Sequence, residues 1–172
     1  MRNLLLAFGV LLFAAFPALA QEGKIGYVDS QKIFAQSPEY QEAQAKFDKE
    51  VEDWNAKAAT MNDEVDKLKE DQQKNSLVWS QAKKKEADEK LKAEQDTLQQ
   101  YLDSTFGANG KAEKRMAELS KPIKDKIVGI IKKVAIENDF EMIFDAANVS
   151  IAYAKENLDI TDQVITELGK GK

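Results

Sequence analysis

The feature that most constrains this chain is a series of apolar and small residues spaced alternately four and three positions apart. The series lies in the segment 46–71, KFDKEVEDWNAKAATMNDEVDKLKED, and consists of Phe47, Val51, Trp54, Ala58, Met61, Val65 and Leu68. This spacing keeps a narrow stripe on one side of a helix, and the stripe is buried only when a second helix lies along it. The sequence therefore predicts a long helix that needs a partner helix.

A second series with the same spacing lies downstream and supplies that partner. It consists of Ala87, Leu91, Glu94, Leu98, Tyr101 and Thr105. Pairing the two series in opposite directions predicts an antiparallel coiled-coil hairpin that folds back at Ser76. In this register Tyr101 lies opposite Val51, and Tyr40 lies opposite Ala112. Phe106 is an alternative to Thr105 as the last seam residue.

Helix start signals define the ends of this hairpin, which we expect to span residues 38–121 as an arm. Ser37-Pro38-Glu39 provides an N-cap, a proline at the first helical position and an acid in the first turn. Ser80 is placed to cap the returning helix. Gly107 and Gly110 interrupt the return, and each glycine costs a helix interior about 1 kcal/mol relative to alanine. We interpret them as a hinge, with a plain loop between two helices as the alternative.

The fold-back carries three adjacent apolar residues, Leu77, Val78 and Trp79. Val78 is interpreted mainly as a cover for the end of the seam. Trp79, at an otherwise exposed turn, is the better candidate for contact with another molecule. The neighbouring lysines are interleaved with acids, which is more typical of a solvated face than of a binding patch.

The two ends of the chain, residues 21–37 and 122–172, predict a small α+β body. Residues 24–29, 140–144 and 151–153 alternate as strands, while an apolar helix face follows Pro122 and a capped helix follows Asp159. Three short strands expose sheet edges and large apolar groups to water. Assembly of several copies around these strands is the expected solution, and a monomer covered by its own helices is the alternative.

Residues 1–20 have the layout of a cleavable secretory signal peptide. A positive start containing Arg2 precedes an apolar run from Leu4 to Phe16, and Ala18-Leu19-Ala20 provides the cleavage pattern. The run is shorter than the roughly 20 residues needed to span a bilayer, although a membrane anchor is an alternative. The mature chain is expected outside the cytoplasm.

Composition excludes several classes of function. The chain has no histidine and no cysteine, so it lacks the commonest general base, the usual zinc ligands and a thiol nucleophile. We therefore expect no enzyme, no catalytic residues, no metal site and no cofactor. The net charge is −5 and becomes −6 when Arg2 is removed with the leader, which offers no general attraction to nucleic acid.

Taken in order, these parts resemble the Skp or OmpH-like periplasmic chaperones. The most specific segments are KIGYVDSQKIF, KPIKDKIVGIIKKVA, FEMIFD and LDITDQVITEL, together with the helical hairpin between the first two. The resemblance implies a homotrimer in which strands of all three chains form one body and three hairpins surround a cavity. The residues that it assigns to this trimer body are Ile25, Tyr27, Phe140, Met142, Phe144, Ile151 and Tyr153.

The resemblance also implies the function. Family members hold unfolded outer-membrane proteins in the periplasm without ATP, before membrane insertion. Candidate client contacts in this chain are Leu77, Val78 and Trp79 at the tip, and those of Phe47, Trp54 and Tyr101 that are not fully buried in the seam. The best-known members are basic, whereas this chain is acidic, so at most a weak contact with a membrane surface is expected. A structural spacer or adaptor of the cell envelope is the alternative function.

Overall fold

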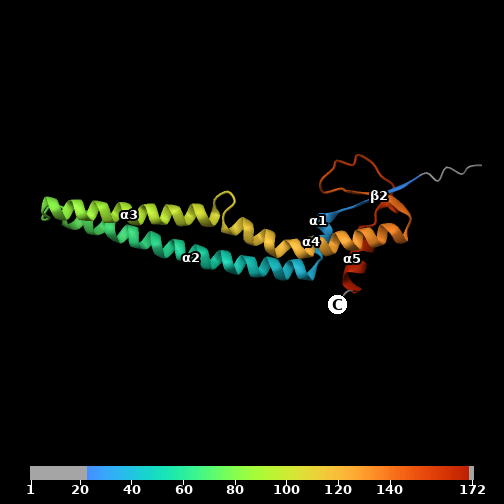
Figure 1. The fold of residues 1–172 in the computed structure, drawn as a ribbon, viewed down its shortest axis with the longest axis horizontal. Helices are drawn as coiled ribbons and strands as arrows, with labels where there is room; N and C mark the ends of the chain where they lie inside the picture. Colours follow the sequence, from blue (N-terminus) through green and yellow to red (C-terminus); the bar gives the residue numbers. More distant parts are fainter. Residues whose placement is uncertain (1–22, 171–172) are drawn as a thin grey trace, which may run out of the picture.

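The computed structural model describes residues 23–170, which form an elongated helical arm attached to a small body (Figure 1). The expected signal peptide, residues 1–20, lies outside the described residues. The arm consists of α2 (Pro38–Asn75), α3 (Gln81–Phe106) and the first part of α4 (Lys111–Glu137). The fold class predicted from the sequence, a mostly helical α+β protein with a long antiparallel hairpin, is confirmed.

The arm begins and folds back where the helix signals place it. The Ser37 hydroxyl accepts a hydrogen bond from the Tyr40 backbone N–H, and Pro38 occupies the first turn of α2. At 1.5 Å per residue, the 38 residues of α2 span about 57 Å. Ser76 ends α2, and the Ser80 hydroxyl caps α3 by accepting from the Lys83 N–H. The seam residues of both series are buried or half-buried, as predicted.

The predicted register between the two helices is wrong, although the seam residues are right. Trp54, expected opposite Leu98, instead lies against the Phe106 ring at a centroid distance of 6.4 Å. Gln72, which the predicted register places opposite Ser80, instead donates a hydrogen bond to Asp88 at 3.1 Å. The cause is the turn of residues 76–80, whose centre lies beyond Ser76. A later turn centre slides α3 along α2 while the same stripes remain in contact.

The register fails again at the base of the arm. Tyr40, expected opposite Ala112, instead packs its ring 5.1 Å from that of Phe34 and lies beside Ser120 and Lys124. The loop of residues 107–110 causes this change, because it adds residues to the return helix and none to α2. Helix α4 then continues through Pro122, where we expected the body to begin.

The body is built on two parallel strands, β1 (Lys24–Val28) and β2 (Phe140–Asp145). Ile25 aligns with Met142, and Tyr27 aligns with Phe144. The short helix α1 (Ser30–Ala35), the second part of α4 and the C-terminal α5 (Thr161–Lys170) pack around one side of the pair. The buried core between these elements consists of Val28, Ile33, Ile123, Ile127, Val134, Ile160, Val164 and Leu168.

The expected third strand at 151–153 is absent from the described chain. Residues 146–155 form an irregular connection, followed by the single 3₁₀ turn η1 (Glu156–Leu158). A strand needs a neighbour for its backbone groups, and the free side of β1 is already contacted at Tyr27, whose carbonyl accepts from the Ile160 N–H at 3.0 Å. Alternating side chains alone were therefore an insufficient signal.

Candidate functional site

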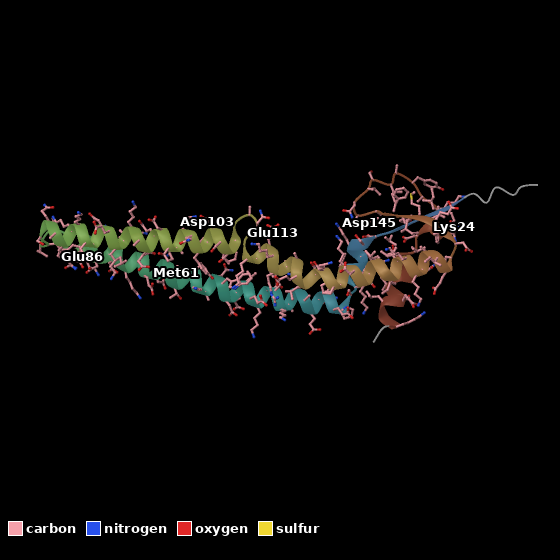
Figure 2. All side chains as sticks on the ribbon, viewed as in Figure 1. Lys24, Met61, Glu86, Asp103, Glu113 and Asp145 are labelled. Atoms are coloured by element: carbon pink, nitrogen blue, oxygen red, sulfur yellow. The ribbon has the colours of Figure 1, made fainter. Side chains whose placement is uncertain are left out.

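The described protein displays its large apolar side chains mainly on the body and at the arm tip. Between these two ends the arm surface is lined with charged and amide side chains (Figure 2). Many of them form ion pairs within one helix, such as Lys74 with Glu70 and Lys121 with Asp125. Solvent-exposed pairs of this kind add little stability, so the arm is held together mainly by its seam.

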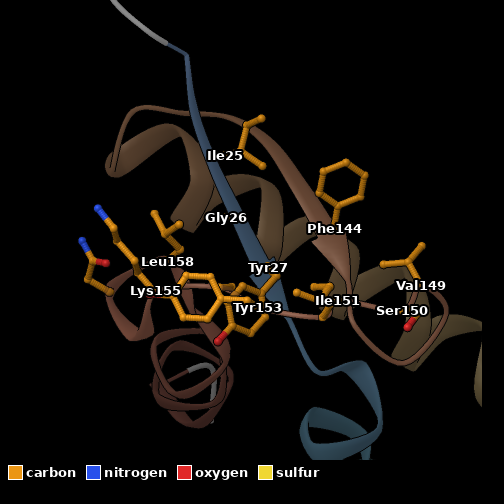
Figure 3. Close-up of a pocket in the computed structure, with 13 residues that line it drawn as sticks. Ile25, Gly26, Tyr27, Phe144, Val149, Ser150, Ile151, Tyr153, Lys155 and Leu158 are labelled. Atoms are coloured by element: carbon orange, nitrogen blue, oxygen red, sulfur yellow. The ribbon is translucent and has the colours of Figure 1, made fainter.

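The body carries an open apolar depression of about 870 Å³ on the outer side of its two strands (Figure 3). The side chains of Ile25 and Phe144 lie on one side of it, and the irregular connection supplies Ile151 and Tyr153. Tyr153 is 84% exposed and Ile25 is 49% exposed, which is unusual for residues of this size. No other part of the described chain covers these side chains, so their burial requires contact with another molecule.

The seven residues assigned to an oligomer body do not share one environment. Met142, Phe144, Ile25, Ile151 and Tyr153 are exposed, whereas Tyr27 is half-buried. Phe140 instead packs against the core, with the Lys24 ammonium 4.0 Å from its ring centroid. The depression gathers five of the seven, Ile25, Tyr27, Phe144, Ile151 and Tyr153, whereas Met142 lines a separate hollow against α4.

Among the large apolar side chains that line the depression, the sequence analysis did not identify Val149 and Leu158. Val149 is 41% exposed and continues the alternation of Ile151 and Tyr153 by one step, so the same pattern could have found it. Leu158 lies in η1, where no apolar periodicity points to it. Leu158 lies at this surface because the next residue, Asp159, pairs with Tyr27 of β1.

Hydrogen bonds fix the ends of both strands beneath this surface. The Asp145 carboxylate at the end of β2 accepts from the Ser30 hydroxyl at 2.7 Å and from the Ser30 and Ala147 N–H groups. Burial acts to raise the pKa of Asp145, but these bonds outweigh it and lower the pKa below its usual value. Partial burial raises the pKa of Tyr27, and the Asp159 carboxylate raises it further. These hydrogen bonds hold the backbone in place at the ends of the strands.

The arm tip presents two nearly bare apolar side chains. Leu77 is 94% exposed and Val78 is 83% exposed, whereas Trp79 is half-buried. The interpretation of Val78 as a cover for the end of the seam is therefore wrong. The helices stop at Asn75 and restart at Gln81, so the intervening turn carries its side chains outward with no third helix to receive them.

The three aromatic residues proposed along the arm also differ in accessibility. Trp54 is 8% exposed and belongs to the seam, where the rings of Phe47 and Phe106 contact it edge-on at centroid distances of 6.3 and 6.4 Å. Phe47 and Tyr101 are half-buried. Among the proposed contacts on the arm, these two retain accessible ring surface.

Gly107 and Gly110 bound a four-residue loop between α3 and α4. Gly107 donates its N–H to the Asp103 carbonyl at 3.0 Å, and an added Cβ would lie 2.4 Å from that oxygen. An added Cβ on Gly110 would lie 2.7 Å from the Gly107 carbonyl oxygen. Asn109 between them adopts a positive φ of 56°. Close backbone approach explains why glycine occupies both ends of the loop.

The described residues form a helical hairpin arm on a small body with a bare apolar face, an architecture that presents an extended surface. Within residues 23–170, no helix has the length and apolar character needed to cross a bilayer, and no cluster of potential metal ligands is found. The family model described as "Outer membrane protein (OmpH-like)" matches residues 24–168. The chain therefore belongs to the OmpH-like family, which confirms the resemblance found in the sequence.

Two individual proteins illustrate this similarity. An uncharacterized protein of Aquifex aeolicus (strain VF5) is 27% identical over 143 residues, which cover 83% of this chain and 84% of the relative. A crystal structure from Caulobacter crescentus CB15, described as a candidate outer membrane chaperone (OmpH-like), has a TM-score of 0.72 at 15% identity. The match covers 86% of this chain and 85% of that chain, so the two proteins share the fold over most of their length.

Proposed function

We propose that this protein is a periplasmic chaperone that holds unfolded outer-membrane proteins without ATP. In this proposal three copies assemble through their bodies, and their arms surround a cavity that receives the client. Family membership supports a chaperone role, and the helical hairpin supplies the walls of the cavity. The observation that carries the proposal is the separation of a bare apolar body face from a bare apolar tip by a long charged arm.

The body face suits association between copies. Ile25, Phe144, Ile151 and Tyr153 form a contiguous apolar surface next to strand edges, and covering both together removes them from water. Association at this end would leave the arms free to extend beside one another, because the whole arm projects away from the body (Figure 1).

The arm suits weak and diffuse client contacts. Leu77 and Val78 are its most exposed apolar groups, and they lie at the end farthest from the body. Each exposed apolar group on this charged surface binds a client weakly. Contacts from several arms together retain the client, while each single contact is released easily. This mode of binding requires no catalytic group and no cofactor.

The experiment is the dilution of a urea-unfolded outer-membrane barrel protein into buffer while light scattering is recorded. The wild-type protein at threefold molar excess is expected to suppress scattering, and Leu77→Ser/Val78→Ser is expected to suppress it less. Gln73→Ser/Ala82→Ser is the matched control, because it changes two exposed residues on either side of the tip. Scattering that is unchanged by the wild-type protein would reject the holdase function.

A pull-down at physiological salt separates this function from that of an envelope spacer. Recovery of many unfolded outer-membrane proteins supports the holdase. Recovery of one folded partner in fixed stoichiometry would support the spacer instead.

A further inference from the structure

The return half of the arm is divided, whereas the outgoing half is continuous. Helix α2 runs without interruption from Pro38 to Asn75, but residues 107–110 separate α3 from α4 (Figure 1). A coiled-coil seam is continuous only while both helices advance at the same rate. The arm therefore contains two seams, a distal one between α2 and α3 and a proximal one between α2 and α4.

The proximal seam is fixed by long-range ion pairs. Arg115 of α4 donates two hydrogen bonds of 2.8 Å to the Glu50 carboxylate, one to each oxygen, and both side chains are only 29% exposed. The hydrogen bonds from Arg115 lower the pKa of Glu50, so this pair remains ionised in neutral solution. Closer to the body, Lys126 pairs with Glu39 at 2.6 Å. Glu39 and Glu50 are as far apart on α2 as their partners Lys126 and Arg115 are on α4. This equal spacing indicates that α2 and α4 keep one register between the two pairs.

The distal seam has no comparable anchor near the loop. Close to the break, α2 and α3 meet through the Tyr101 hydroxyl on the Trp54 carbonyl, the Lys57 ammonium over the Tyr101 ring and the Phe106 ring on the Trp54 ring. Phe106 is itself 39% exposed. Toward the tip, Gln72 donates to Asp88 at 3.1 Å between two exposed side chains.

Trp54 is the one side chain that joins the two seams in these contacts. Phe106 approaches its ring from the last residue of α3, and the Lys111 ammonium lies 4.8 Å from its centroid at the first residue of α4. The two residues that flank the loop, Phe106 and Lys111, therefore both contact the Trp54 ring. Loss of either contact frees one segment from the ring without breaking a helix.

We propose that residues 107–110 are a hinge between two rigid segments of the arm and that Trp54 is the latch that holds them in line. When the latch is released, the distal segment swings relative to the proximal segment, with bending of α2 near Trp54. The Glu50–Arg115 pair keeps α2 and α4 together in the proximal segment during this motion. The device would change the width of the space beside the arm without unfolding either seam.

The absence of cysteine from the chain allows this motion to be measured with introduced spin labels. Lys85→Cys and Lys121→Cys place labels at exposed positions on either side of the hinge. Thr60→Cys and Lys92→Cys place a control pair within the distal segment. Labelled full-length protein is mixed with an excess of unlabelled protein, so that distances within one chain dominate.

Phe106→Ala and Lys111→Gln each remove one side of the latch. Either change is expected to widen the Lys85–Lys121 distance distribution roughly twofold, since a few weak contacts hold the closed state. The Thr60–Lys92 distribution is expected to stay as in the wild type. Lys114→Gln is the matched control, because it removes an exposed charge one turn further along α4 and is expected to change neither distribution.

A second readout follows the latch directly. In a Trp79→Phe background Trp54 is the only tryptophan, and its quenching by acrylamide is expected to increase in both latch variants. Equal widening of both label pairs, or no widening in either variant, would overturn the hinge. The measurements use no client, so their outcome is independent of the holdase assay.

Discussion

Replacement of Trp54 by alanine tests how far the stability of the arm depends on the packing of its seam residues. The side chain is 8% exposed, two aromatic rings contact it edge-on, and the Lys111 ammonium lies over it. Truncation of a buried tryptophan costs about 3–5 kcal/mol. The lower value applies here, because the seam has water on both sides and collapses readily around a gap. The expected loss is therefore about 3 kcal/mol of local stability in the arm.

Hydrogen–deuterium exchange with mass spectrometry measures this loss region by region. At 1.4 kcal/mol per factor of ten, the variant is expected to open the arm roughly 100-fold more often. Peptides covering residues 47–61 and 98–112 should lose protection to this degree, whereas peptides from β1 and β2 should not. Trp54→Phe retains a ring in the seam and should cause a clearly smaller change.

Two results would refute the reasoning. A loss of protection smaller than about fivefold would mean that Trp54 contributes little to the seam. An equal loss in the arm and in the strands would mean that the arm and the body unfold together. In that case the arm would not be an independent unit of stability.

Three further predictions concern the body and the return helix. Lys133 and Lys170 lower the pKa of Glu167 from 4.5 to about 2, so its stabilising effect is complete above the unfolded value and is lost as the pH falls toward 2. Glu167→Gln should therefore flatten the acid side of the stability profile, measured by urea unfolding at several pH values; an unchanged slope would contradict this. Phe144→Glu places a charge in the apolar depression and should reduce self-association in sedimentation velocity, whereas Lys155→Glu at its rim should not; equal behaviour would argue against the body face as the interface. Gly129→Ala, with open space at its Cβ, should raise the melting temperature by about 2–4 °C for each kcal/mol gained, while Gly107→Ala should lower it because of the 2.4 Å approach to Asp103; a rise in both would contradict the close approach.

The sequence alone was sufficient for the class of fold and for the membership of the seam. Local signals carry this information: an apolar spacing of four and three is a property of one helix, and caps such as Ser37 and Ser80 act within one turn. The core face of α4 follows from the same rule, since Ile123, Ile127 and Val134 recur on one side of a helix and are all buried. These predictions needed no knowledge of what lies across the molecule.

The candidate site was only partly predictable. The tip residues were found because they interrupt a regular pattern, but which of them are bare depends on the path of the turn, and Val78 rather than Trp79 is the more exposed. Ile25, Phe144 and Tyr153 were named from alternation and resemblance. That they lie beside one another, together with Leu158, depends on the route of residues 146–160, which the alternation of apolar side chains within this segment does not determine.

Only the tertiary structure decided the register of the arm, the missing third strand and the joint at Trp54. Each of these depends on where two distant segments meet, and a seam slid by one helical turn buries the same residues. Local sequence therefore determines which face of an element is apolar. The position of its partner is determined by the turn at residues 76–80, the inserted loop at 107–110 and the contacts that fix them.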